Sequence, residues 1–176
     1  MTILDTIAER AKLRVAFYKE NLPLDELKQP ALSFPKGDFP FESALKRSGL
    51  SFICECKKAS PSKGLIAPDF NCLEIAQAYE AAGADAVSIL TEPEFFLGDD
   101  KFLAEIAAQV SIPCLRKDFV VDEYMIYQAK VFFASAVLLI CAILDDVQLK
   151  NFIATCDKLG LSALVEAHDE TEIKRA

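Results

Sequence analysis

The chain has 176 residues, of which 52% are hydrophobic and 26% are charged, a balance typical of one folded domain and unlike that of a disordered segment. Its 27 acidic and 19 basic residues give a formal net charge of −8, which argues against nucleic acid as a partner because phosphates are bound by clustered lysine and arginine. The longest apolar run, residues 131–144, is shorter than the ~20 residues that cross a bilayer, so no membrane partner is expected.

Residues 1–50 are predicted to form a helical extension that stands apart from the rest of the chain. Apolar residues recur there at helical spacing and predict a first amphipathic helix: Ile3, Ile7, Ala11, Val15 and Phe17. A short helix is also predicted over residues 42–47, after a stretch that is interrupted by Pro30, Pro35 and Pro40. The sequence leaves open whether this extension covers the bottom of the domain or lies over its opposite end.

Residues 51–176 alternate between apolar runs and helical segments. Strands are predicted over residues 52–57, 86–91, 112–117, 136–142 and 163–168. Helices are predicted over residues 73–82, 99–109, 122–130, 145–159 and 169–176. This alternation predicts repeated βαβ units around a parallel sheet, and continuous apolar strands such as AVLLICAIL indicate burial on both faces.

Two α/β architectures fit this pattern, an open doubly wound sheet and a (βα)8 TIM barrel. A nucleotide-binding open sheet favours a phosphate loop after its first strand, but neither G-x-G-x-x-G nor a P-loop is found there. A complete barrel needs ~250 residues, so this chain accommodates about five of the eight βα units. We therefore expect an incomplete barrel, in which the first and fifth strands have unpaired edges that allow self-association.

Charged residues recur where the predicted strands end. Side chains alternate across a strand, and the C-terminal strand ends of a parallel barrel form its active-site face. Three of the predicted strands deliver charged side chains to that end: Glu55, Lys57, Lys117 and Glu166. By the same alternation, Arg116 and Asp118 point toward the helices. One charged strand end is usually a solvated ion pair, whereas two carboxylates and two ammonium groups at one mouth indicate general acid–base catalysis.

Three further features each have a structural and a functional interpretation. Residues 59–64 form either a turn or a phosphate-binding loop, since they combine two serines, a lysine and a glycine. Phe95 and Phe96 follow the second strand and either line a ligand pocket or pack beneath their loop. For His168, the one histidine, we expect a structural role or a contact at a helix N-terminus.

The six cysteines include no C-x-x-C pair, and a single histidine accompanies them, so zinc-ligand spacing is absent from the sequence. Most of them lie in apolar runs. We expect buried, reduced thiols in a cytoplasmic protein.

Five segments, taken together and in this order, resemble the indole-3-glycerol-phosphate synthase family: ECKKASPSKGLI at 55–66, SILTEPEFFLG at 88–98, PCLRKDFVVDEYMIYQA at 113–129, AVLLICAIL at 136–144 and LVEAHDE at 164–170. The resemblance implies a TIM barrel with an N-terminal extension. It also implies an enzyme of tryptophan biosynthesis that converts 1-(2-carboxyphenylamino)-1-deoxyribulose 5-phosphate to indole-3-glycerol phosphate, by ring closure with decarboxylation and then dehydration. The expected partner is this phosphorylated small molecule, with no cofactor and no metal.

The resemblance also implies roles for single residues. Lys117 is similar to the general acid that protonates the substrate carbonyl, and Lys57 to a lysine that contacts the substrate carboxylate or acts as the acid in dehydration. Glu55 and Glu166 are similar to carboxylates that handle protons and stabilise the developing iminium ion. Ser60 matches a phosphate-contacting serine. Five positions match residues that line the aromatic-ring pocket: Ser88, Phe96, Phe119, Leu138 and Ile140.

Two features depart from the family pattern. Phe132 and Phe133 precede the fourth strand, where the family usually has a small residue or glycine, so we expect an effect on stability at the bottom of the barrel. The second departure is that the chain ends in the fifth helix, whereas the other active-site residues of the family lie on strands six to eight. The alternative is therefore a non-catalytic half-barrel that self-associates or needs a complementing fragment. A third possibility is another phosphate-binding barrel, such as an isomerase of the same pathway or a Schiff-base aldolase that uses Lys117. The motif set argues against it, because an aldolase does not call for the paired Glu55 and Lys57 together with Glu166.

Overall fold

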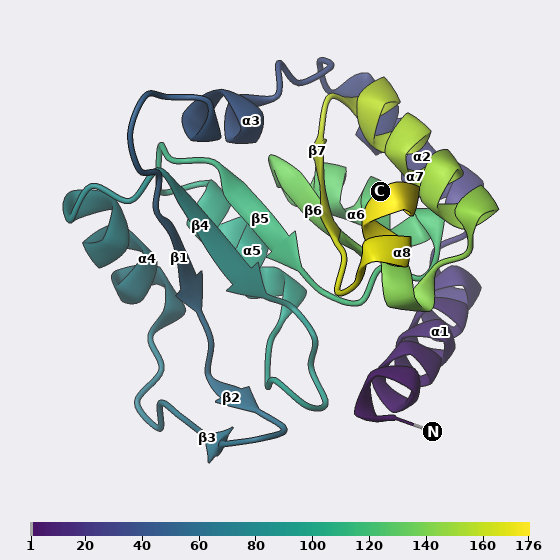
Figure 1. Ribbon diagram of the computed structural model, residues 1–176, viewed down its shortest axis with the longest axis horizontal. Coiled ribbons are helices and arrows are strands. Elements are labelled where there is room, and N and C mark those ends of the chain that lie inside the picture. Colours follow the sequence, from purple (N-terminus) through teal and green to yellow (C-terminus); the bar gives the residue numbers. More distant parts are fainter. Residues whose placement is uncertain (1) are drawn as a thin grey trace.

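The computed structural model describes residues 2–176 and contains a five-stranded parallel sheet preceded by three helices (Figure 1). The strands lie side by side in the order β1-β4-β5-β6-β7. Their bounds are Ile53–Cys56 for β1, Ala86–Leu90 for β4, Cys114–Lys117 for β5, Ala136–Ile140 for β6 and Ser162–Glu166 for β7. Each neighbouring pair is parallel, so the expected α/β fold, a partial barrel, is confirmed.

Helices alternate with these strands along the chain. Their bounds are Cys72–Ala81 for α4, Asp100–Ala107 for α5, Glu123–Val131 for α6, Asp146–Leu159 for α7 and Glu170–Arg175 for α8. The predicted helix starts are confirmed to within a residue or two. Helices α5 to α8 begin at capping aspartates, which are visible in the sequence. Four aspartates each accept a hydrogen bond from an amide of the first turn: Asp99, Asp122, Asp145 and Asp169.

The two faces of the sheet carry different parts of the core. Outward-facing apolar residues pack against the helices, as Val87, Ile89 and Leu139 do. Inward-facing residues form a smaller cluster that joins Phe41 to three strands: Ala86, Leu115 and Ala136. Phe41 is 2% exposed, and burying such a side chain contributes roughly 1.5–3 kcal/mol. The helices therefore cover one face, while the interior of the partial barrel is filled mainly at its N-terminal end.

The N-terminal helices reach both ends of this barrel. They are α1, Ile3–Asn21, α2, Leu24–Ser33, and α3, Pro40–Leu45. In Figure 1, α3 lies at the N-terminal ends of the strands, where it delivers Phe41, and α1 lies toward the ends at which the strand arrows point. Helix α2 packs along α6 between them. The sequence left the two placements as alternatives, and the chain adopts both.

Helix α2 was not predicted, because its segment contains Pro30. Proline in a helix interior removes a backbone hydrogen bond and costs about 3 kcal/mol. Here tertiary contacts outweigh that cost: Leu27 and Ala31 are buried at 3% and 0% exposure, and Lys28 Nζ lies 5.1 Å from the centre of the Tyr127 ring.

Other differences from the prediction are local. Residues 59–65 contain a short hairpin, in which β2, Ala59–Ser60, pairs antiparallel with β3, Gly64–Leu65. The fourth predicted strand ends earlier than expected, because Cys141–Ile143 form a 3-10 turn, η1. Within residues 2–176, no helix combines the length and apolar character needed to span a bilayer.

Phe133 occupies a backbone conformation that favours glycine. Helices α4, α6 and α7 are followed by residues with positive φ, namely Gly83 at 90°, Phe133 at 61° and Gly160 at 70°. At α4 and α6 the hydrogen bonds match, since Gly83 N–H donates to Glu80 and Phe133 N–H to Lys130. A side chain in this left-handed region costs roughly 1–2 kcal/mol. The Phe133 ring is 55% exposed and meets Phe34 edge-on at 5.2 Å.

We expect Phe133→Gly to be more stable than Phe133→Ala by about 1 kcal/mol, measured by urea unfolding. Both variants lose the ring and its contact with Phe34, so their difference isolates the backbone conformation. Equal stability of the two variants would show that the left-handed geometry carries no strain.

Candidate functional site

Three of the predicted charged residues meet at the C-terminal ends of β1 and β5. Lys57 Nζ lies 2.6 Å from Glu55 Oε1, and Lys117 Nζ lies 3.4 Å from Glu55 Oε2. Ser88 Oγ, on the intervening strand β4, donates to Glu55 Oε2 at 3.3 Å. One carboxylate thus receives two ammonium groups and a hydroxyl from neighbouring strands, because β4 pairs Glu55 with Ser88 and Leu90 with Lys117.

The surroundings of Glu55 keep it ionised. Burial acts to raise the pKa of Glu55, but the hydrogen bond from Lys57 and the charges of Lys117 and Lys57 outweigh burial and hold the pKa below its usual value of 4.5. At neutral pH Glu55 is therefore the negatively charged partner of both lysines. An ammonium held in this way is a proton donor ready for a substrate oxygen.

Glu166 lies at the same mouth but at the opposite edge of the sheet, where β7 ends. It lies within 3.1 Å of His168 Nε2, and His168 Nδ1 lies 3.3 Å from Glu172 Oε2. The His168 backbone N–H also donates to Glu172 at 2.7 Å, just before α8 begins. His168 thus makes the expected contact at a helix N-terminus, and it also contacts Glu166.

A small cavity of about 200 Å³ links the two sides of the mouth. Its lining combines one lysine, two acidic residues, two aromatic rings and four aliphatic side chains: Lys117, Glu166, Asp118, Phe96, Phe119, Leu138, Ile140, Leu90 and Leu4. The rings of Phe96 and Phe119 are 6.0 Å apart between centroids, and they form an aromatic wall. Four of the five residues expected around an aromatic ring therefore line one cavity. The fifth, Ser88, lies beneath Glu55 and is 3% exposed.

A larger cavity of about 630 Å³ adjoins the first. The two cavities share Leu4 and the aromatic wall. The larger one is lined by Lys57, by the hairpin residues Ser60, Pro61, Ser62, Lys63 and Ile66, and by Ile3 and Ile7 of α1. Hydroxyls and ammonium groups on one side suit an anion, and apolar side chains on the other suit a ring. Glu55 opens instead on a third hollow beside β1, together with Lys57 and Tyr79.

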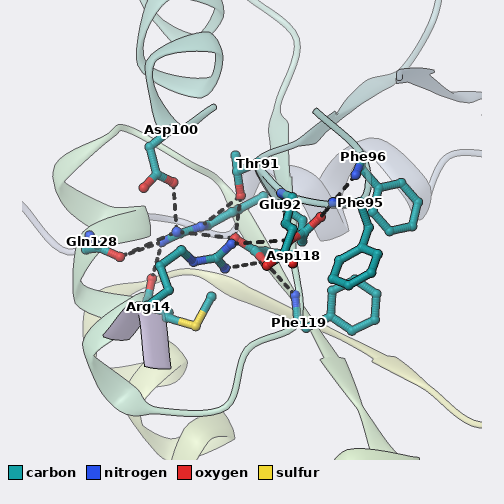
Figure 2. A network of polar contacts seen from close by, with 12 residues as sticks. Arg14, Thr91, Glu92, Phe95, Phe96, Asp100, Asp118, Phe119 and Gln128 are labelled. Carbon is teal, nitrogen blue, oxygen red and sulfur yellow. Dashed lines mark hydrogen bonds and ion pairs between the residues drawn. The ribbon is translucent and has the colours of Figure 1, made fainter. Parts of the chain in front are cut away.

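A buried network of charged residues lies directly behind this mouth (Figure 2). Arg116 is 0% exposed and donates to Asp100 at 2.7 Å and to the Met125 carbonyl at 2.7 Å, on the helix side of the sheet. Asp118 is also fully buried. Burial acts to raise its pKa, but Arg14 and Arg116 outweigh burial and hold the pKa of Asp118 below its usual 3.8. The predicted orientation of Arg116 and Asp118 toward the helices is confirmed.

Sequence reasoning missed Arg14 and Glu92 as members of this network. Arg14 lies in a helix whose pattern indicated only an amphipathic surface, yet it donates to Asp118 at 2.7 Å. Glu92 is 2% exposed and accepts the backbone N–H of Phe96 at 3.0 Å. A signal was present for Glu92, because an acidic residue just after an apolar strand and before a proline turn is well placed to bind the amides of that turn.

The chain beyond Glu92 folds back tightly on β4. The Gly98 N–H donates to the Glu92 carbonyl at 2.8 Å, and a Cβ atom at Gly98 would collide with the backbone of Leu90 and Thr91. Only glycine allows this approach.

Among residues 2–176, no group of three or more His, Cys, Asp or Glu side chains is arranged to hold a metal ion.

We expect Lys57→Met to raise the pKa of Glu55, because the variant loses the hydrogen bond and the charge that oppose burial. The measurement is a carboxyl-carbon NMR titration of the folded chain. Lys58→Met is the matched control, since Lys58 follows directly and the lysines that lower the pKa of Glu55 are Lys57 and Lys117. An unchanged titration of Glu55 in Lys57→Met would contradict the pairing.

Comparison with known proteins shows the family of the chain. A family model described as indole-3-glycerol phosphate synthase matches residues 4–176. The indole-3-glycerol phosphate synthase of Ruminiclostridium cellulolyticum is 54% identical over 175 residues, which are 99% of this chain and 67% of the relative. Relatives of the same name from Endomicrobium trichonymphae and Lachnoclostridium phytofermentans are 52% and 47% identical; each alignment covers 99% of this chain, and 68% and 69% of the relatives. The chain belongs to the indole-3-glycerol phosphate synthase family.

Proposed function

We propose that this chain carries the acid–base part of an indole-3-glycerol-phosphate synthase, a carbon–carbon lyase of tryptophan biosynthesis. The substrate is 1-(2-carboxyphenylamino)-1-deoxyribulose 5-phosphate, and the product is indole-3-glycerol phosphate. The observation that supports this most directly is the cavity in which Lys117 and Glu166 share an aromatic wall with Phe96 and Phe119. A phenyl ring fits against the wall, with a proton donor and a carboxylate beside it.

In the first step, a carbon–carbon bond forms between the ring carbon that bears the carboxylate and the ketone carbon of the substrate. Lys117 donates a proton to the ketone oxygen, which becomes a hydroxyl as the bond forms. Glu55 supports this role, because it holds the Lys117 ammonium in place at 3.4 Å. The carboxylate then leaves as carbon dioxide and restores electrons to the ring system.

In the second step, the new hydroxyl leaves as water and the indole double bond forms. Lys57 acts as the acid that protonates the leaving hydroxyl, or it holds the substrate carboxylate during the first step. Glu166 or Glu55 removes the proton that the intermediate loses as the indole double bond forms, and it stabilises the cationic iminium intermediate. The placement of Lys57 on the border of both the larger cavity and the hollow beside β1 is compatible with either role.

The phosphate is assigned to the larger cavity. Ser60 and Ser62 present hydroxyls within 3.5 Å of each other, and the Lys63 backbone N–H donates to Ser60 Oγ at 3.3 Å. This hairpin therefore offers hydroxyls, an ammonium group and a tight turn to an anion that the net charge of −8 would otherwise repel. We expect the activity in the cytoplasm, which keeps the six free thiols reduced.

A direct assay follows the indole fluorescence of the product. We expect little or no turnover from residues 1–176 alone, because among residues 2–176 the strands β1 and β7 each pair on one side only and the barrel is not closed. We expect turnover when the C-terminal third of the Ruminiclostridium relative is supplied as a separate polypeptide.

In that complemented enzyme, Lys117→Ala should lower kcat by at least about a hundredfold, the usual contribution of a general acid. Lys158→Ala is the control, since Lys158 lies in the last turn of α7, away from the mouth. Near-normal turnover with Lys117→Ala would remove Lys117 from the proposed role.

A second candidate is a non-catalytic half-barrel that associates with a second copy. The open sheet favours it, because in the described part of the chain β1 and β7 each pair on one side only, and Phe52 and Ile53 at the β1 edge are 58% and 40% exposed. In this case the chain would sediment as a dimer, and Ile53→Lys would shift it toward the monomer. A monomer at all concentrations tested would exclude this candidate.

A further inference from the structure

Two carboxylates that follow neighbouring strands hold the two phenylalanines of the aromatic wall. Glu92, after β4, accepts the backbone N–H groups of Phe95 at 2.7 Å and of Phe96 at 3.0 Å. Asp118, after β5, accepts the backbone N–H of Phe119 at 2.8 Å. The position of each wall residue is therefore set by a carboxylate that is itself buried.

One guanidinium lies between these two carboxylates. Figure 2 shows Arg14 reaching from α1 toward both. Its nitrogens lie 2.7 Å from Asp118 Oδ1 and 3.8 Å from Glu92 Oε1. The side chain of Arg14 is 13% exposed, and those of Glu92 and Asp118 are 2% and 0% exposed. We call this group the Glu92–Arg14–Asp118 clamp.

Glu92 depends on Arg14 more than Asp118 does. Asp118 keeps other partners, since it also accepts from Thr91 at 2.8 Å and lies 3.6 Å from Arg116. Within residues 2–176, the ion pair of Glu92 is with Arg14. A buried carboxylate that loses its cation is no longer compensated for the loss of water, so it moves toward solvent and its bonds to backbone N–H groups weaken. Loss of Arg14 should therefore loosen the loop at Phe96 more than the chain at Phe119.

The same helix supplies part of the cavity. Leu4 lines both cavities, and Ile7 lines the larger one, so α1 is a wall of the site as well as the source of Arg14. Helix α1 is docked by its buried apolar residues Ala8, Ala11 and Val15 and by Arg14, and the contact of Arg14 also reaches the carboxylates that hold the aromatic wall. By linkage, a ring that binds against the ordered wall favours the docked helix to the same extent that the helix favours the ring.

We propose that Arg14 and Glu92 are positioning residues that fix Phe96 against Phe119 and so determine the affinity of the site for an aromatic ring. This inference rests on the proposed function in its choice of a carboxylated phenyl ring as ligand. The ordering of the wall is independent of that choice. The alternative is that the network only stabilises the fold and leaves the ring site unaffected.

The test compares Arg14→Met with Arg10→Met in the 176-residue chain. Arg10 lies one turn away on α1 and pairs with Glu94 of the same loop at 3.6 Å, but both side chains are at least half exposed. Such a surface pair contributes little, so Arg10→Met is a matched control. The first measurement is hydrogen exchange at the amides of residues 94–96 and 119. The second is binding of the fluorescent probe anthranilate, and thermal unfolding reports on the fold.

For Arg14→Met we expect exchange at residues 95 and 96 to accelerate about tenfold and anthranilate to bind about tenfold more weakly, with smaller changes at residue 119. Arg10→Met should match the unsubstituted chain. A folded Arg14→Met chain with unchanged exchange at residues 95 and 96, or with unchanged anthranilate affinity, overturns the proposal.

Glu92→Gln keeps the shape of the side chain and decides the matter if Arg14→Met fails to fold. It should accelerate exchange at residues 94–96 and leave residue 119 as in the unsubstituted chain, because Asp118 retains both arginines. Equal effects at both places, or none, would indicate a purely structural network. If the unsubstituted chain does not bind anthranilate, the proposed ring site fails, while the exchange measurement still decides whether the clamp orders the wall.

Discussion

The structure depends on the buried carboxylate of Asp118. It lies at the end of the central strand β5, has no exposed surface, and is surrounded by Arg14 from the N-terminal extension and Arg116 from its own strand. Removing one partner from such a pair typically costs about 3–5 kcal/mol, because the remaining charge is left without solvent or counter-ion. Arg116 in turn binds Asp100 at the start of α5 and the carbonyl of Met125 in α6. One set of charges therefore fixes a strand, two helices of the barrel and the first helix of the extension relative to one another.

The alternation of side chains along β5 converts this anchoring into a functional arrangement. Arg116 and Asp118 point toward the helices and are held by the network, so Lys117 between them is turned toward the barrel interior and the carboxylate of Glu55. The proposed proton donor is thus positioned by its own neighbours in the sequence. The residue that follows, Phe119, is held through its backbone by Asp118 and forms half of the aromatic wall. Four consecutive residues combine support and chemistry because successive positions face opposite sides of the sheet.

The extension serves two ends of the barrel with different physical interactions. At the bottom, Phe41 fills the interior among Ala86, Leu115 and Ala136, a contact that is wholly apolar. At the mouth, Arg14 supplies charge to carboxylates that would otherwise face one another without a cation between them. The apolar contact acts by volume and tolerates substitution by side chains of similar size. The ionic contact is directional and is the one on which the geometry of the mouth depends.

Local patterns in the sequence were enough to predict the order of strands and helices, the capped starts of α5 to α8, and the face of each strand on which Lys57, Lys117 and Glu166 lie. These features follow from local rules, since the side-chain period of a strand and the capping of a helix involve residues only a few positions apart. Which charges meet depends instead on how distant segments pack in the folded chain. The partners of Asp118 come from 104 residues earlier and from two positions away, and helix α2 forms despite Pro30 because α6 packs against it. Neither Arg14 nor Glu92 was singled out from the sequence, although Glu92 stands where it can bind the amides of the turn that follows it. They are functional candidates because folding buries both beside the aromatic wall, where a charge is stable only with a partner that no local pattern specifies.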